Sequence, residues 1–293
     1  LEYDVNDSFN TFLSLALSNT SYQRVDYFNY LDSDPLQTTD TYNFLGYSAK
    51  GGANYRINQN HNIFANIGYF EKAADFRSVF LNFNNESINA DAENQKITSF
   101  ELGYGYRSGK LSANVNVYHT AWRDRTEFVS FEQPDGTFAV ANILGVDAIH
   151  QGLELDFVYR ASEKIKITGM ASFGNWLWDS NVENVQITNE DQEIEETVDL
   201  YIEGLHVADA AQTTMALGLN YKLTPKTTFI VDYNYYANLY ADFDPSDRGT
   251  QGAPDAWKMP DYGLFDTVIS HTFDLGPFET TMTARMNNVF DTE

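Results

Sequence analysis

Six aromatic residues are the side chains of this sequence best suited to holding a ligand, because an aromatic face can stack on a sugar or another planar molecule. They are Trp176, Trp178, Tyr235, Tyr236, Tyr240 and Trp257. We predict ligand contacts for five of them, namely Trp176, Trp178, Tyr236, Tyr240 and Trp257. The alternative is a belt of aromatic anchors at a membrane interface, which is the commoner role for a single residue of this kind.

Catalytic and metal-binding motifs are not found. The five histidines stand apart in sequence, and no HExxH, GxSxG or Walker pattern occurs. Residues 189–196 (NEDQEIEE), with Asp199, offer oxygen ligands for calcium but lack the spacing of a calcium loop. Glu101 and Glu154 are more typical of a polar network than of acid–base catalysis. We therefore predict no enzyme activity, no metal and no cofactor.

The charge balance excludes one class of partner. The chain has 42 acidic and 18 basic side chains and a formal net charge of −24. Binding to nucleic acid requires clustered Lys and Arg that neutralise phosphates. We therefore expect no nucleic-acid partner. The absence of cysteine also excludes disulfides and thiolate metal sites.

The elements that must position these side chains are strands of alternating polarity. Residues 154–160 show the pattern, with Leu155, Phe157 and Tyr159 on one face and mainly polar residues on the other. About eleven such segments occur. Their approximate ranges are 9–27, 42–57, 62–74, 96–107, from 111, 150–160, 165–178, 215–221, 229–236, from 264, and up to 286.

Short and long connections alternate between these segments. Short turns are predicted at 58–60, 108–110, 161–164, 223–226 and 275–277, and long polar connections at 28–41, 79–95, 125–147, 179–209 and 243–259. This alternation is typical of an antiparallel transmembrane β-barrel, in which short turns face the periplasm and long loops face outside. No apolar run reaches the roughly 18 residues that a spanning helix needs.

The two faces of the predicted strands also fit a barrel. Lys50, Gly52, Asn54 and Arg56 lie on one face of their strand, as a polar lumen requires, and alternation places Trp176 on the lumen face with Lys166 and Thr168. A basic side chain facing lipid near mid-bilayer costs about 2–4 kcal/mol. None of the predicted apolar faces contains one.

Four segments resemble the C-terminal half of the barrel of TonB-dependent outer-membrane receptors, particularly the Bacteroidetes type. They are 18–30 (SNTSYQRVDYFNY), 97–125 (ITSFELGYGYRSGKLSANVNVYHTAWRDR), 150–176 (HQGLELDFVYRASEKIKITGMASFGNW) and 285–293 (RMNNVFDTE). The last is similar to the Asn-Asn-Leu-Phe-Asp stretch before the family's final strand. The resemblance implies a 22-stranded barrel filled by an N-terminal plug, of which residues 1–293 would supply strands 11 to 21.

The resemblance further implies active import of a scarce or large solute (siderophore, cobalamin, glycan or peptide) across the outer membrane of a Gram-negative bacterium. The expected partners are outer-membrane lipid, the chain's own plug and remaining strands, and the TonB complex. The plug, the TonB box and the final strand match nothing in residues 1–293, and no residue supports a surface lipoprotein partner. A passive porin, or a soluble β-rich binding domain, is the alternative.

Overall fold

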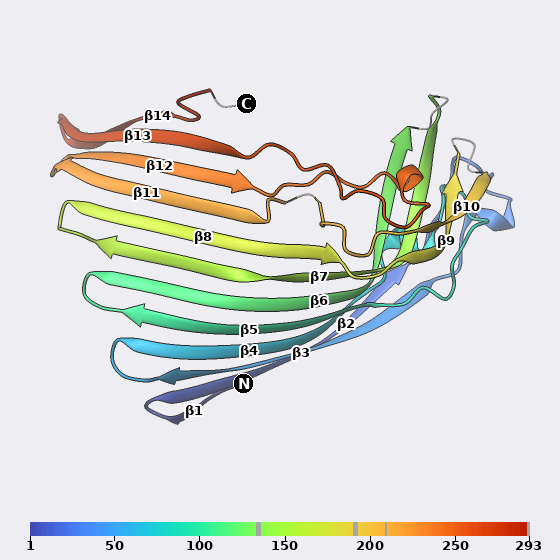
Figure 1. Ribbon diagram of the computed structural model, residues 1–293, viewed down its shortest axis with the longest axis horizontal. Coiled ribbons are helices and arrows are strands. Elements are labelled where there is room, and N and C mark those ends of the chain that lie inside the picture. Colours follow the sequence, from blue (N-terminus) through green and yellow to red (C-terminus); the bar gives the residue numbers. More distant parts are fainter. Residues whose placement is uncertain (133–135, 190–192, 209, 292–293) are drawn as a thin grey trace.

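The computed structural model describes residues 1–132, 136–189, 193–208 and 210–291, and forms one antiparallel sheet of 14 strands (Figure 1). Twelve strands follow one another in a curved wall. These are β1 (Glu2–Asn6), β2 (Phe9–Tyr22), β3 (Tyr42–Arg56), β4 (His61–Lys72), β5 (Gln95–Arg107), β6 (Leu111–Glu132), β7 (Phe138–Arg160), β8 (Ile165–Trp178), β11 (Thr213–Thr224), β12 (Thr227–Ala237), β13 (Tyr262–Leu275) and β14 (Phe278–Met286).

Alternation gives the wall one apolar and one polar face. The register continues across strands, so that Leu155 pairs with Val115 and Ala171, and Ala171 pairs with Met215, in one apolar row. The intervening row contains Glu154, Asn116 and Ser172. A hollow of about 570 Å³ is lined mainly by residues of the polar face, among them Asp156, Asp232 and Asp266, which makes this the concave face.

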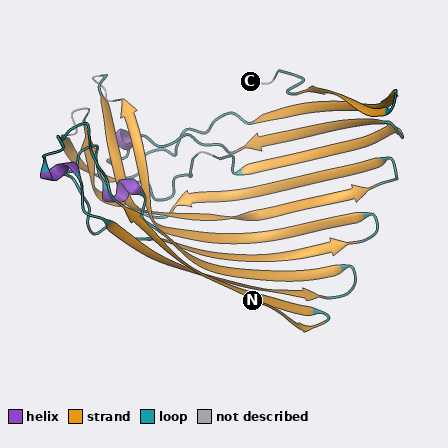
Figure 2. Cartoon of the chain, turned by 180° about the vertical axis from the view of Figure 1, so that it is seen from behind, coloured by secondary structure: helices purple, strands orange, loops and turns teal. Residues whose placement is uncertain are grey.

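The wall is open. Its strand order runs from β1 to β14, and within the described part of the chain these two end strands do not pair with each other (Figure 2). Short turns gather at one end of the wall and long connections at the other, the left and right ends of Figure 1. We call these the short-turn end and the long-loop end. None of the helices in the described residues is long and apolar enough to cross a membrane.

The predicted all-β antiparallel fold is confirmed, and each of the eleven predicted strands is present. Three strands were missed. β1 is short and pairs with β2 through Glu2, Tyr3 and Asp4. Two more, β9 (Val182–Thr188) and β10 (Ile194–Leu200), form a hairpin inside the predicted loop 179–209. The first predicted strand also ends at Tyr22 rather than near residue 27.

The predicted loop 125–147 is wrong in part, because most of it belongs to β6 and β7. These strands are 22 and 23 residues long and continue as a hairpin beyond their neighbours. Each face of the extension is covered. Ala141 and Ile143 lie in a buried apolar cluster, while the Asn142 amide donates to the carbonyl of Arg77 at 2.6 Å. Burial on both faces removes the clean alternation on which the prediction depended.

A β-bulge bends this hairpin where it leaves the wall. The register between β6 and β7 shifts between Trp122 and Arg125, and Asp124 has a φ of 58°. Ionic contacts fix the bend: Arg123 reaches Asp147 at 2.8 Å and Asp179 at 2.6 Å. Such bulges commonly redirect strands at the rims of barrels.

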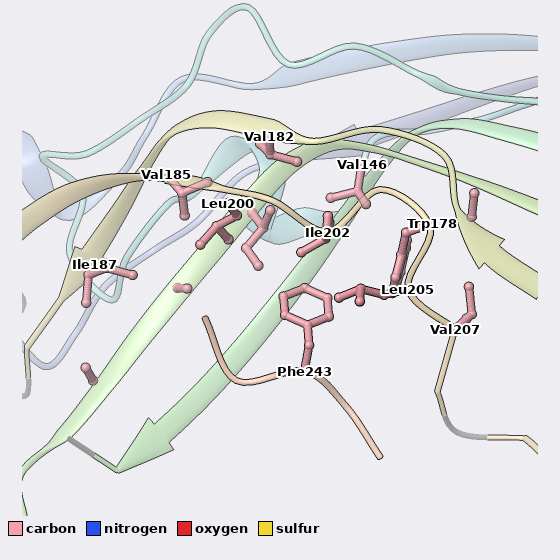
Figure 3. Close-up of a cluster of buried hydrophobic side chains, with 14 residues drawn as sticks. Val146, Trp178, Val182, Val185, Ile187, Leu200, Ile202, Leu205, Val207 and Phe243 are labelled. Atoms are coloured by element: carbon pink, nitrogen blue, oxygen red, sulfur yellow. The ribbon is translucent and has the colours of Figure 1, made fainter. Parts of the chain in front are cut away.

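The main buried core lies at the long-loop end and not inside the wall. Figure 3 shows the cluster, in which β9, β10 and the following loop pack onto the outer half of β7. Its labelled members include Val146, Val185, Leu200, Ile202 and Phe243. Three short helices, η1 (Pro35–Gln37), α1 (Phe76–Val79) and η2 (Pro245–Asp247), lie in the other long connections. The long-loop end is therefore a folded cap.

Candidate functional site

The candidate site is the aromatic rim, a set of ring-bearing residues at the long-loop end of the wall and in the adjoining loops. It comprises two groups. The first contains Tyr118, His150 and Trp176 on wall strands. The second contains His206, Tyr240 and Trp257 in the connections after β10 and β12.

Trp176 anchors the first group on the concave face. Its indole Nε1 donates to the Tyr118 hydroxyl at 2.9 Å, and its ring centroid lies 5.5 Å from that of His150, its partner across β7 and β8. The structure thus places Trp176 on the face that alternation predicted. The Trp176 side chain is half-buried on this face.

Two glycines make this arrangement sterically feasible. A Cβ on Gly152 would lie 2.7 Å from the Tyr118 hydroxyl, and one on Gly174 would lie 2.7 Å from the Trp176 indole nitrogen. Both distances are shorter than real Cβ contacts. The absence of side chains at these positions therefore allows both aromatic rings to lie along the sheet surface.

Gln212 joins the wall to the adjoining loop and was not predicted from the sequence. It is 2% exposed. Its amide nitrogen donates to the carbonyls of Trp176 at 3.0 Å and Val207 at 3.2 Å, and its amide oxygen accepts from the Trp176 backbone N–H at 2.8 Å. A glutamine between predicted strands carries no signal of such a role, because its partners are backbone groups distant in sequence.

Trp178, for which a ligand contact was predicted, is buried inside the cap. It is 4% exposed and packs in the buried cluster, with its ring perpendicular to that of Phe243 at 6.1 Å. The Arg125 guanidinium covers the ring at 4.9 Å. In this structure the side chain stabilises the cap, and no face of it is open to a solute.

The second group ties two loops together. The rings of His206 and Tyr240 stack with centroids 4.1 Å apart and an interplanar angle of 4°. Asp255 accepts hydrogen bonds from the His206 imidazole and, at 3.1 Å, from the His206 backbone N–H. Burial alone would raise the pKa of Asp255, but these hydrogen bonds outweigh it and the pKa is lowered.

The remaining predicted aromatics are more exposed. Trp257 is 67% exposed beside this loop junction, where its carbonyl accepts from Ala241 N–H at 2.9 Å. Tyr236, on the concave face of β12, stacks on Tyr262 at 5.0 Å. Tyr235 lies on the opposite, apolar face, and its hydroxyl donates to Asp261 at 3.2 Å. Tyr235 is therefore placed as an interfacial anchor would be.

The other candidate groups do not assemble into a reactive centre. Within the described ranges no three His, Asp or Glu side chains are placed to hold a metal ion. Positions 190–192 of the predicted acidic segment lie outside the described residues. Glu101 accepts from the Asn66 amide at 2.8 Å on the concave face. The aromatic rim combines flat ring faces with hydrogen-bonding groups, a chemistry suited to holding a planar or sugar-like solute.

Residues 2–289 match the protein-family model described as "TonB dependent receptor-like, beta-barrel". No curated protein matches the chain.

Comparison with solved structures gives several similar folds. The copper transporter OprC is 18% identical with a TM-score of 0.68, over 98% of this chain and 41% of that one. The ferric citrate transporter FecA is 13% identical with a TM-score of 0.66, over 98% and 39%. The ferripyoverdine receptor of Pseudomonas aeruginosa is 15% identical with a TM-score of 0.60, over 99% and 33%. The chain thus spans about two fifths or less of these structures, and the likeness shows the shared fold.

Proposed function

Because this chain belongs to the family of TonB-dependent receptor-like β-barrels, we propose that it forms part of the wall of an outer-membrane importer. The family's structural relatives are transporters and receptors rather than enzymes. On this proposal the chain makes and breaks no bond, the short-turn end is periplasmic and the long-loop end is extracellular. The solute passes along the concave face.

One observation carries the proposal: the open wall has an apolar convex face and a polar concave face over its whole width. Exposed apolar residues such as Leu15, Leu102 and Leu217 lie on the convex face, where lipid would cover them. A soluble domain would bury such a face against a second layer. The polar lumen and the lipid-facing band are the two surfaces that a membrane barrel requires.

We further propose that residues 1–293 supply the C-terminal portion of the barrel, with the plug, the final strand and the TonB-contacting segment encoded elsewhere in the full protein. The open edges at β1 and β14 support this division, because unpaired backbone groups in hydrocarbon cost several kcal/mol each. A match to only two fifths of the related structures is consistent with it.

The aromatic rim is proposed as the first contact of the solute. Three members of the rim, Trp176, Tyr240 and Trp257, support this role, and Tyr236 on β12 offers a further ring at the same end. Trp178 contributes only indirectly, because it packs inside the cap. The relatives carry copper, ferric citrate and ferripyoverdine. Chelated or complexed metals are therefore the first solutes to test.

A conductance measurement separates this proposal from a passive porin. The full-length protein is purified in detergent and reconstituted into planar lipid bilayers. A plugged importer is expected to insert without a steady open-channel current, because the plug fills the lumen. Steady stepwise conductance from the intact protein would contradict the proposal and favour the porin. Uptake of radiolabelled ferric citrate and copper, in cells with and without TonB, then tests for energy coupling.

A further inference from the structure

The short-turn end of the concave face carries a row of four cations at equivalent positions. We call it the cationic row, and its members are Arg56, Arg107, Arg160 and Lys222. They lie at or near the ends of β3, β5, β7 and β11, the strands that run toward the short turns. All four side chains are exposed.

A repeated backbone hydrogen bond shows that the positions are equivalent. In each case the backbone N–H of the cationic residue donates to the last residue of the preceding short turn. The four bonds are Arg56 to Ser8 at 2.7 Å, Arg107 to Asn60 at 2.7 Å, Arg160 to Lys110 at 2.7 Å, and Lys222 to Lys164 at 2.9 Å. The same bond joins Thr272 to Lys226 at 2.8 Å. Four of five equivalent positions are thus basic in a chain with more than twice as many acidic as basic residues.

These charges lack ion-pair partners in the described part of the wall, where the Arg56 guanidinium donates only to a backbone carbonyl, that of Asp7, at 3.4 Å. Among the ion pairs of the described residues, none includes a member of the cationic row. Arg160 even lies directly opposite Lys166 across β7 and β8, and like charges at such a position are destabilising. By contrast the nearby turn residue Lys226 is paired with Asp274 at 2.8 Å.

A cavity of about 270 Å³ lies between the first two cations. Its lining includes Arg56, Arg107, Gln59 and several asparagines, and it includes no carboxylate. Gly105 forms part of the floor, where a Cβ would approach the Asn62 amide oxygen at 2.4 Å. A guanidinium-rich, amide-lined hollow without acidic residues is suited to a carboxylate or another oxyanion.

We propose that the cationic row binds an acidic polypeptide segment that crosses the short-turn mouth of the concave face. A lipid headgroup is disfavoured because the strand positions face the lumen. A single small anion would use only the cavity between Arg56 and Arg107. Four cations on alternate strands are instead spaced by about 10 Å, and an extended chain matches this spacing with a carboxylate at about every third residue.

This inference rests on the proposed function only for calling the short-turn end periplasmic. It assigns to the barrel wall an acidic polypeptide ligand on that side, contributed from outside residues 1–293. At physiological ionic strength the screening length is about 8 Å, which is shorter than the spacing of the row, so each cation acts mainly on the carboxylate nearest to it.

Zero-length carbodiimide coupling tests the proposal in the full-length protein in its native outer membrane. The reagent joins a carboxylate to a lysine that contacts it. Native Lys222 can therefore be tested directly for a contacting carboxylate, and positions 56 and 107 can be tested in the charge-conserving variants R56K and R107K. The Lys226–Asp274 pair is the internal positive control, and the exposed turn residue Lys110 is the matched negative control. Linked peptides are identified by mass spectrometry.

We expect amide links from all three reporter positions to Asp or Glu residues outside residues 1–293. Raising the salt to about 1 M shortens the screening length to about 3 Å and should lower these yields several-fold. The proposal is overturned if the Lys226 link forms but the reporters give none, or give links only to Asp7 or Glu163 of the same wall. Protection of R56K and R107K by inorganic phosphate, with no link at Lys222, would show a small-anion site and would also overturn it.

The outcomes remain distinct from those of the conductance test. If the protein shows no steady conductance and no reporter links form, only the proposal of an acidic ligand is contradicted. If reporter links form in a protein that conducts steadily, the acidic ligand is supported and the importer proposal is contradicted.

Discussion

At the scale of single residues, the side chain with the greatest structural consequence at the aromatic rim is an amide, not an aromatic. Gln212 satisfies both backbone groups of Trp176 and one carbonyl of the adjoining loop. A buried polar group that loses its partner costs about 1–3 kcal/mol. The position of Trp176 therefore depends on a residue that is not itself part of the stacking surface.

We expect Q212L to lower the free energy of unfolding by about 1–3 kcal/mol, because three hydrogen bonds to backbone groups are lost while the side-chain volume changes little. Urea titration of the full-length protein in detergent, followed by tryptophan fluorescence, measures this. Q151L is the matched control, since Gln151 is exposed and its side chain hydrogen-bonds to the His119 ring at 3.3 Å rather than to backbone groups. Equal stability of the two variants would contradict the assigned role.

A second prediction concerns Asp255. Its lowered pKa means that the His206–Asp255 contact stabilises the loop junction above the ordinary carboxyl pKa of 3.8 and is lost as the pH falls through the lower folded value. Because the Asp255 side chain is 39% exposed, the contribution is about 1 kcal/mol or less. D255N removes the carboxylate charge by substitution, as acid removes it by protonation. We therefore expect D255N at neutral pH to weaken the junction by the same amount as acid weakens it in the wild type.

Amide hydrogen exchange at Val207 and Ala241, corrected for intrinsic rates, measures the strength of this junction. D247N is the control, because Asp247 is an exposed residue of the same connection. Unchanged protection of Val207 in D255N would show that stacking on Tyr240 suffices without the carboxylate.

At the scale of elements, the alternation of side chains decides which face of each strand meets lipid. We expect L155R to impair assembly by about 2–4 kcal/mol, because it places a charge on the convex face near mid-bilayer. E154R, one residue away on the concave face, should assemble normally, since Glu154 is exposed there. Heat-modifiable migration in gel electrophoresis reports assembly. Equal behaviour of both variants would show that the two faces are assigned wrongly.

The same alternation explains how much of the fold could be predicted from the sequence. All eleven predicted strands occur. They could be recognised in the sequence because each has one apolar face and one polar face. The outer halves of β6 and β7 escaped prediction because Ile143 and Asn142 are both covered, on opposite faces, by other connections. Likewise Trp176 was placed correctly by its position on a strand, whereas Trp178 is buried by a loop that sequence periodicity does not describe.

At the scale of the whole molecule, the wall is incomplete by itself. Its end strands β1 and β14 each present an unpaired edge within the described residues. We expect residues 1–293, expressed alone, to give no heat-modifiable barrel in detergent, whereas the full-length protein should give one. Restoration by co-expression of the remaining segments would support the division of the barrel proposed above. A stable, monomeric, heat-modifiable product from residues 1–293 alone would contradict it.

The repeated bond between each short turn and the next strand also bears on the order of assembly. From β1 to β14 every wall strand pairs with its neighbour along the chain, apart from the β9–β10 excursion between β8 and β11. Each completed hairpin leaves a turn carbonyl in place to receive the following strand. The wall can therefore lengthen by successive hairpins, each closing only a short loop. A partly assembled wall would therefore already present a correctly registered template for the next hairpin.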